Sequence, residues 1–154
     1  QGLFIDSTTI RTAITNGRVE EAANMLGRNF VLSGTVVKGN GIGTQLGYPT
    51  ANIHQNEGEL PLVVPGDGIY ATWAHIAGST QYMAATSIGV RPTFGGTNQT
   101  VEAYLLDYDD DMYGKSINIE FVQRVRDEIK FDSVEELTAQ ISRDVDATRF
   151  LLSD

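Results

Sequence analysis

The sequence predicts a mainly β protein, a small antiparallel barrel or sandwich with a short helical lead-in and one C-terminal helix. Three observations indicate this class. The hydrophobic period changes to two near Phe30, several short β-rich runs follow without helices between them, and one long amphipathic pattern closes the chain. Strands that follow one another without intervening helices argue against a parallel sheet.

The first thirty residues predict two short helices. Ser7 can cap the first helix, which ends at Asn16 and Gly17, and the second ends at Gly27. Their apolar positions are Ile10, Ala13, Ile14, Val19, Ala22, Ala23 and Leu26. The segment is either a linker from upstream sequence or a pair of helices that covers one end of the barrel, and the pattern is compatible with both.

The strands are expected in runs rich in β-branched and aromatic residues, which cover residues 30–37, 69–77, 81–88, 100–107 and 115–122. The last run alternates most clearly, with Ile117, Ile119 and Phe121 on one face. Turn residues at 78–80 and 109–111 predict hairpins, so we expect consecutive strands to pair there.

The C-terminal helix is predicted by an apolar stripe of helical spacing, formed by Val134, Leu137, Ile141, Val145, Thr148 and Leu152. Asp132 or Ser133 is expected to cap it, with Glu135 or Glu136 completing a capping box.

Composition excludes several classes of function. The 154 residues fit one globular domain with a short appendage, and the net charge of −9 argues against nucleic-acid binding. The chain has no cysteine and only two histidines, which excludes Cys-ligated metal centres, disulfides and cysteine nucleophiles. Since no apolar run approaches a membrane span, we expect a soluble cytoplasmic protein.

A glycine-rich segment is the most unusual part of the chain, with glycines at positions 39, 41, 43 and 47. Such glycines let the backbone approach phosphate oxygens closely. The segment has neither the Gly-Lys pair of a P-loop nor the spacing of a dinucleotide fold. Thr50 and Asn52, two apart in an extended segment, can point a hydroxyl and a carboxamide at one Mg²⁺ or phosphate, although an ordinary β-bend also explains them.

Six motif blocks in order resemble the riboflavin kinase family, in particular the kinase module of bacterial bifunctional FAD synthetases. The first block is Gly34-x-Val36-x-x-Gly39-x-Gly41-x-Gly43-x-x-Leu46-Gly47-x-Pro49-Thr50-Ala51-Asn52. The others are Gly68-Ile69-Tyr70, Ser87-Ile88-Gly89-x-Arg91-Pro92-Thr93-Phe94, Val101-Glu102, Tyr113-Gly114-Lys115 and Arg126-Asp127-Glu128-x-Lys130-Phe131-Asp132-Ser133. The resemblance covers residues 30–152 almost end to end.

The resemblance implies a fold, an activity and a domain division. The fold is a six-stranded antiparallel Greek-key barrel with a C-terminal helix, and the activity is transfer of the γ-phosphoryl group of MgATP to the 5′-hydroxyl of riboflavin, giving FMN and ADP. Residues 6–11 resemble the end of the family's adenylyltransferase module. We therefore expect residues 1–29 to be a helical linker from that module and residues 30–154 to be the kinase domain, monomeric when isolated.

The resemblance also implies roles for individual residues. Glu102 matches the catalytic carboxylate, and Thr50 and Asn52 match ligands of Mg²⁺ and the ATP phosphates. Further ATP contacts are implied for Gly39, Gly41, Gly43, Gln45, Gly47, Leu105, Asp107, Tyr113 and Gly114. Flavin contacts are implied for Glu102, Arg126, Asp127, Lys130 and Phe131.

One departure from the family pattern keeps an alternative open. Relatives usually carry basic residues in the glycine-rich segment, where this chain has Ile42, Thr44 and Gln45. Because neutral groups hold phosphate less strongly than lysine or arginine, a non-catalytic flavin-binding or regulatory module is the alternative.

Overall fold

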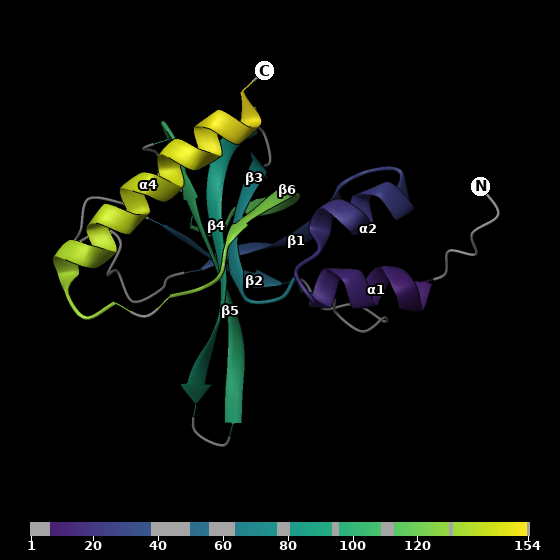
Figure 1. Cartoon of the computed structure of the whole chain (residues 1–154), viewed down its shortest axis with the longest axis horizontal. Helices are drawn as coiled ribbons and strands as arrows, with labels where there is room; N and C mark the ends of the chain where they lie inside the picture. Colours follow the sequence, from purple (N-terminus) through teal and green to yellow (C-terminus); the bar gives the residue numbers. More distant parts are fainter. Residues whose placement is uncertain are drawn as a thin grey trace.

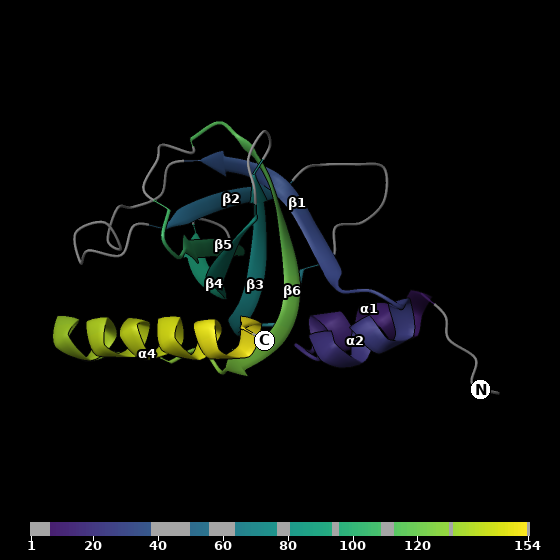
Figure 2. The same ribbon diagram turned by 90° about the horizontal axis from the view of Figure 1, so that it is seen from above.

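A computed structural model of the chain describes residues 7–37, 50–55, 64–76, 81–93, 96–108, 113–129 and 131–153. Six antiparallel strands close into a barrel in the order β1-β2-β5-β4-β3-β6 (Figures 1 and 2). The strands are β1 (Phe30–Val37), β2 (Ala51–Gln55), β3 (Gly68–Ile76), β4 (Gln81–Thr93), β5 (Gly96–Leu105) and β6 (Ser116–Arg126). In the described residues the helices are α1 (Ser7–Thr15), α2 (Val19–Leu26) and α4 (Val134–Leu152).

The pairing of the strands confirms the expected barrel and corrects one connection. Strands β3, β4 and β5 form a meander, and β6 returns to lie beside β3, which is a Greek-key arrangement. The hairpin predicted at residues 109–111 is wrong, because β5 pairs with β2 and β4 whereas β6 pairs with β1 and β3. Turn residues indicate that the chain changes direction, but they do not fix which strands become neighbours.

The barrel interior holds the main core. Its buried apolar side chains include Leu32, Val36, Ile53, Tyr70, Ile88, Leu105, Ile117, Ile119 and Phe121. The rings of Tyr70 and Phe121 meet edge to face, with centroids 5.2 Å apart. Two threonines, Thr72 and Thr86, are also buried there, and their hydroxyls lie 2.8 Å apart, which satisfies both polar groups.

Two register shifts bend β6 where it runs along β3. They fall between Ile69 and Tyr70 and between Ala71 and Thr72 on the β3 side. Such bulges re-aim the side chains that follow them. Arg124 lies opposite Tyr70 between the two shifts, and Arg126 lies opposite Ile69 beyond the second shift, at the end of the strand.

Helix α4 packs against the outer face of β3, β4 and β6. The predicted stripe is correct at Thr148 and Leu152, which are buried, but wrong at Val134, which is 58% exposed. Val134 is the first residue of the helix, and this end of α4 extends past the strands (Figure 2). The helix buries Asp144 instead, a residue that the apolar pattern does not single out.

The N-cap of α4 is Ser133, whose hydroxyl accepts a hydrogen bond from the Glu136 amide at 3.1 Å. We expect Ser133→Ala to lower the free energy of unfolding by about 1 kcal/mol, because the amide loses its partner. Urea denaturation measures this, with Ser142→Ala on the exposed middle of the same helix as the control. Equal stability of the two variants would contradict the assigned cap.

Helices α1 and α2 pack together and α2 lies against β1 and β6. The turn between them contains Gly17, which has φ of 81° and whose Cβ, if present, would lie 2.8 Å from Arg124 Nε. The Gly66 amide also donates to the Ile14 carbonyl at 3.0 Å. These contacts show that the two helices cover part of the barrel, which is compatible with both expectations.

Candidate active site

The pairing of β2 with β5 brings the predicted metal ligand and the predicted catalytic carboxylate together. Asn52 lies directly opposite Glu102, and the neighbouring pair is Ala51 with Ala103. Both alanines are fully buried inside the barrel, so Asn52 and Glu102 face outward. Directly opposed residues of an antiparallel pair have Cβ atoms about 5 Å apart. Thr50 precedes β2 by one residue, two positions before Asn52, which places it toward the same side.

A third polar residue continues this row on the next strand. Ser87 of β4 lies opposite Glu102 on the side away from Asn52. The order Asn52, Glu102, Ser87 therefore crosses β2, β5 and β4 on the outer face of the barrel. The sequence motif contains Ser87, but its position beside Glu102 follows only from the register.

Tyr113 and Gly114, two predicted nucleotide contacts, form a turn against the end of β1. The Gly114 amide donates to the Val36 carbonyl at 2.8 Å, and Gly114 has φ of 82°, which favours glycine. Tyr113 is 51% exposed. The turn thus lies where the chain leaves β1 toward the glycine-rich segment. Gly39, Gly41, Gly43, Gln45 and Gly47 are outside the described residues.

Leu105 and Asp107, two further predicted nucleotide contacts, differ in which of their groups a ligand can reach. The Leu105 side chain is buried in the barrel core, so it can offer a ligand only its backbone. Asp107 has φ of 61° and accepts two hydrogen bonds, each of 2.9 Å, from the Arg149 guanidinium of α4. Hydrogen bonding to Arg149 lowers the pKa of Asp107, which keeps this carboxylate ionised.

The predicted flavin contacts at the end of β6 are engaged in ion pairs. The Arg126 guanidinium donates to both carboxylate oxygens of Asp144, at 2.8 and 2.7 Å. Gln140 donates to the same carboxylate at 3.0 Å. Asp127 accepts a hydrogen bond of 2.7 Å from Arg124, and Phe131 is half-buried just before α4. Lys130 is outside the described residues.

Glu128 is a residue of this region that the sequence reasoning did not assign to the site. Its carboxylate lies against the backbone of Gly89 on β4, so that a Cβ at Gly89 would be 3.0 Å from the Glu128 carboxyl carbon. Partial burial of the carboxyl group raises the pKa of Glu128, and the charges of Asp67 and Glu102 raise this pKa further, whereas Arg126 lowers it. Glu128 therefore shares its surroundings with the predicted catalytic residue.

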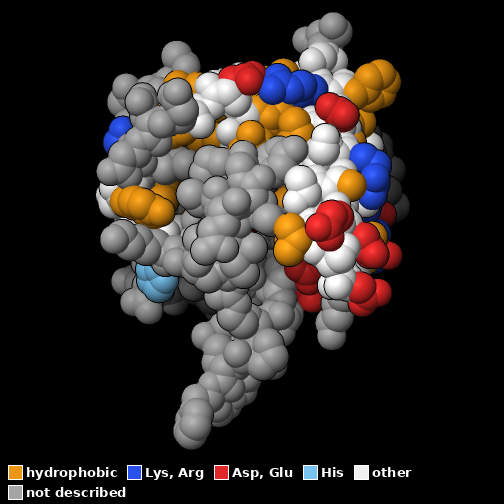
Figure 3. All heavy atoms as spheres, turned by 90° about the vertical axis from the view of Figure 1, so that its left-hand side faces the viewer, with side chains coloured by type: hydrophobic (Ala, Val, Ile, Leu, Met, Phe, Trp, Pro, Cys, Tyr) orange, Lys and Arg blue, Asp and Glu red, His pale blue; other side chains and the backbone are white. Residues whose placement is uncertain are grey.

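Acidic side chains gather on the side of the molecule that carries the N-terminal end of α4 (Figure 3). The first turn of that helix contains Glu135 and Glu136. Within the described ranges no group of three or more His, Asp or Glu side chains is arranged to hold a metal ion. Thr50 and Asn52 instead provide neutral oxygen atoms, which suit a Mg²⁺ that takes its other ligands from phosphates and water.

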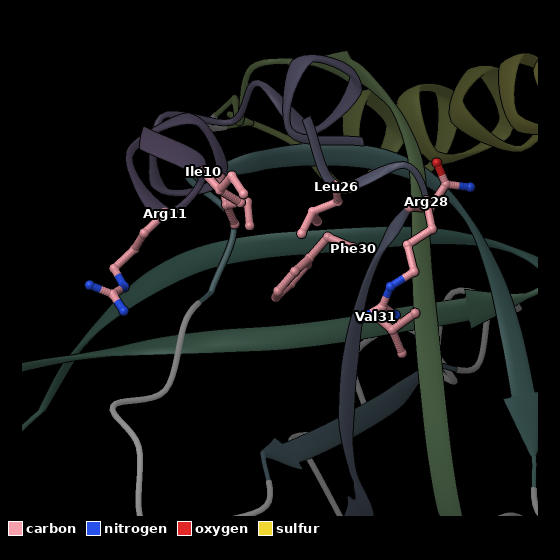
Figure 4. Close-up of a pocket in the computed structure, with 8 residues that line it drawn as sticks. Ile10, Arg11, Leu26, Arg28, Phe30 and Val31 are labelled. Atoms are coloured by element: carbon pink, nitrogen blue, oxygen red, sulfur yellow. The ribbon is translucent and has the colours of Figure 1, made fainter. Parts of the chain in front are cut away.

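A pocket of about 300 Å³ lies elsewhere, between α1, the end of α2 and the start of β1. Figure 4 shows Leu26 and Phe30 at its centre, with Arg11 and Arg28 on opposite sides. None of its lining residues belongs to the predicted site. In the part of the chain that the structure describes, no helix is long and apolar enough to cross a membrane.

Comparison with known proteins places the chain among riboflavin kinases. The family model Flavokinase, described as riboflavin kinase, matches residues 26–152. A bifunctional riboflavin kinase/FMN adenylyltransferase of Haemophilus influenzae is 34% identical over 145 residues, covering 94% of this chain and 46% of the relative. The Escherichia coli K12 protein of the same description is 38% identical, covering 93% of this chain and 44% of the relative. The chain thus spans about half the length of these relatives.

Two solved structures agree with the fold. The riboflavin kinase of Trypanosoma brucei superposes with a TM-score of 0.60 at 30% identity, covering 80% of each chain. A Streptococcus pneumoniae chain described as a macrolide-efflux protein superposes with a TM-score of 0.87 at 38% identity, covering 94% of this chain and 46% of that one. The family assignment rests on the family model and the curated relatives. The chain therefore belongs to the riboflavin kinase family and contains that family's kinase domain.

Proposed function

We propose that this chain transfers the γ-phosphoryl group of ATP to the 5′-hydroxyl of riboflavin, giving FMN and ADP. The observation that carries the proposal is the register of β2 and β5, which sets Asn52 opposite Glu102 on the outer face of the barrel in a riboflavin kinase domain. Phosphoryl transfer depends mainly on positioning and on stabilisation of charge, so a carboxylate and neutral oxygen ligands on one face supply what this reaction needs.

Glu102 is proposed to accept the proton of the attacking hydroxyl. The residue lies within β5 between Val101 and Ala103, both buried, so the backbone that carries it is held by the core. A base held on a rigid strand is worth about 10²- to 10⁴-fold in rate. Ser87, beside Glu102 on β4, is positioned to bind the same substrate or to orient the carboxylate.

Thr50 and Asn52 are proposed to hold Mg²⁺ together with the ATP phosphates. When bound, the ion neutralises charge on the phosphates and aligns them for transfer. Gly39, Gly41, Gly43, Gln45 and Gly47 are proposed to cover the nucleotide by backbone and side-chain hydrogen bonds. Tyr113 and Gly114, with Asp107 and the backbone of Leu105, are proposed to frame the adenine.

The proposed flavin contacts are Glu102, Arg126, Asp127, Lys130 and Phe131. Arg126 and Asp127 are already held by Asp144 and Arg124, so they offer a loop that is fixed in place before the flavin binds. This arrangement favours Phe131, rather than the paired charges, as the group that contacts the ring.

Further proposals concern the full-length protein, its location and the oligomeric state of the isolated module. We propose that residues 1–29 join the kinase domain, residues 30–154, to an adenylyltransferase module in the full-length protein, as in the bifunctional relatives. The complete protein would then convert riboflavin to FAD. A cytoplasmic location is also proposed, and the isolated module is proposed to be monomeric.

The proposal is tested by incubating the chain with riboflavin, ATP and Mg²⁺ and separating the flavins by chromatography. FMN is the expected product. Flavin binding without FMN at any concentration of ATP or metal would contradict it and would leave the flavin-binding module as the function.

The role of the two neutral ligands gives a separate prediction. We expect Asn52→Ala and Thr50→Ala to raise the Mg²⁺ concentration needed for half-maximal FMN formation by roughly tenfold, because losing one hydrogen-bonding or ligand group near a charge costs about 1.5 kcal/mol or more. Titration of activity with Mg²⁺ measures this. Asn118→Ala on the exposed face of β6 is the matched control, and an equal shift in the control would contradict the assignment.

A further inference from the structure

Gly89 and Glu128 form a contact on the same face as the proposed base. Gly89 lies two residues after Ser87 on β4, and it pairs with Thr100, which lies two residues before Glu102 on β5. Residues two apart on a strand face the same side. The direction in which a Cβ of Gly89 would point is therefore outward, beside Glu102, and diagonal neighbours of this kind lie about 7 Å apart.

The Glu128 carboxylate occupies the space that a side chain at position 89 would fill. A Cβ there would lie 3.0 Å from both Cδ and one carboxylate oxygen of Glu128, and still closer to the other oxygen. Gly89 thus lets a carboxylate from the segment after β6 lie directly on the β4 backbone. This contact of the Glu128 carboxylate with the Gly89 backbone is called the seat below. It requires glycine because a side chain would not fit, and not because of the backbone conformation, since Gly89 is not among the described residues with positive φ.

The charges around this seat restrict what it can bind. Glu102 and Asp67 are close enough to Glu128 to disfavour its ionised form, and Arg126, which opposes them, is already paired with Asp144. An anionic group would meet three carboxylates here. A neutral ligand rich in hydroxyl donors would meet acceptors, because a carboxylate can accept several hydrogen bonds at once.

We propose that Glu128, seated on Gly89, binds the polyol chain of the flavin substrate. Its carboxylate accepts hydrogen bonds from hydroxyls next to the 5′-hydroxyl, whose proton Glu102 is proposed to accept. This inference rests on the proposed riboflavin kinase function and adds a residue to its substrate site. Riboflavin carries a neutral chain of hydroxyls between its ring and the reacting end, which matches the donors that the seat requires. The phosphates of ATP belong on the other side of Glu102, beside Asn52 and Thr50.

The test compares two flavins that share the ring and differ in the chain. Riboflavin carries the polyol, and lumiflavin has a methyl group in its place. Quenching of flavin fluorescence gives the Kd of each for the wild-type chain and for Glu128→Gln. We expect Glu128→Gln to weaken riboflavin binding roughly tenfold, as for loss of a charged hydrogen-bond acceptor, and to leave lumiflavin binding within about twofold.

A second variant displaces the carboxylate without removing it. Gly89→Ala puts a methyl group where the Glu128 oxygen lies, and the flexible glutamate can move aside while the backbone stays. This variant should show the same selective loss for riboflavin. Glu135→Gln, on the exposed first turn of α4, is the charge-matched control and should bind both flavins as the wild-type chain does.

The outcomes separate this inference from the function on which it rests. An equal loss for both flavins in Glu128→Gln, or unchanged riboflavin binding, would overturn the role of Glu128 even if the chain makes FMN. Selective loss of riboflavin affinity supports that role even if no FMN forms, because binding is measured without ATP. In kinetics, the inference predicts a higher KM for riboflavin with the KM for ATP within about twofold, and the reverse would overturn it.

Discussion

Replacement of Glu102 by glutamine is expected to lower kcat for FMN formation by about 10²- to 10⁴-fold, the range for loss of a general base. Glutamine keeps the size of the side chain but cannot take a proton. Since Val101 and Ala103 anchor this part of β5 in the core, the strand should hold its register with Asn52 and Ser87. Riboflavin and ATP should therefore still bind.

Steady-state kinetics together with a flavin-binding titration separate the two effects. Glu120→Gln is the matched control, because Glu120 is also a half-buried glutamate on the outer face of a strand, where it pairs with His75 at 3.1 Å. We expect the control to retain its rate. A Glu102→Gln variant with the rate of the wild-type chain would show that the proton is taken by another group or directly by the phosphate.

Replacement of Asp144 by alanine is expected to lower the free energy of unfolding by about 3–5 kcal/mol, because it leaves a largely buried arginine without its partner. The Arg126 and Asp144 side chains are only 17% and 8% exposed, and both carboxylate oxygens accept from the guanidinium. The pair also connects α4 to the end of β6, from which the proposed flavin loop continues. Denaturant unfolding measures the loss.

Two comparisons test that explanation. Asp107→Asn removes the charge that pairs with Arg149 and suits the positive φ of this position. The Arg149 and Asp107 side chains are 46% and 71% exposed, so this variant should lose far less stability than Asp144→Ala. Replacing both partners, with Arg126→Met and Asp144→Leu, should recover most of the lost stability, because no buried charge remains unpaired. A double variant as unstable as Asp144→Ala would mean that packing of α4, rather than charge, sets the cost.

The fold could be predicted from the sequence where local patterns were strong. Strand β1 begins and ends where its alternation does, and Ser133 caps α4 as the capping box indicates. Strand β2 is short and contains polar residues such as Asn52 and His54, so periodicity alone did not identify it as a strand. The pairing of β5 with β2, rather than with β6, depends on closure of the whole barrel and leaves no local signal.

The candidate site was predicted by motifs, and its geometry was not. The motifs named Asn52 and Glu102, but only the register places them opposite each other. Glu128 and Asp144 were missed for a physical reason. Each owes its place to a partner far away in the sequence, Gly89 for the first and Arg126 for the second, and a single sequence does not reveal such pairs.

Transfer of labelled phosphate tests the central claim most directly. The chain is incubated with riboflavin, Mg²⁺ and ATP labelled in the γ-phosphoryl group, and the label is followed in the separated products. We predict that the label appears in FMN, on the 5′-oxygen of the ribityl chain, in an amount equal to the ADP formed. We also predict that Glu102→Gln slows the transfer by about 10²- to 10⁴-fold. Label released only as inorganic phosphate, or ADP formed at the same rate without riboflavin, would contradict the account.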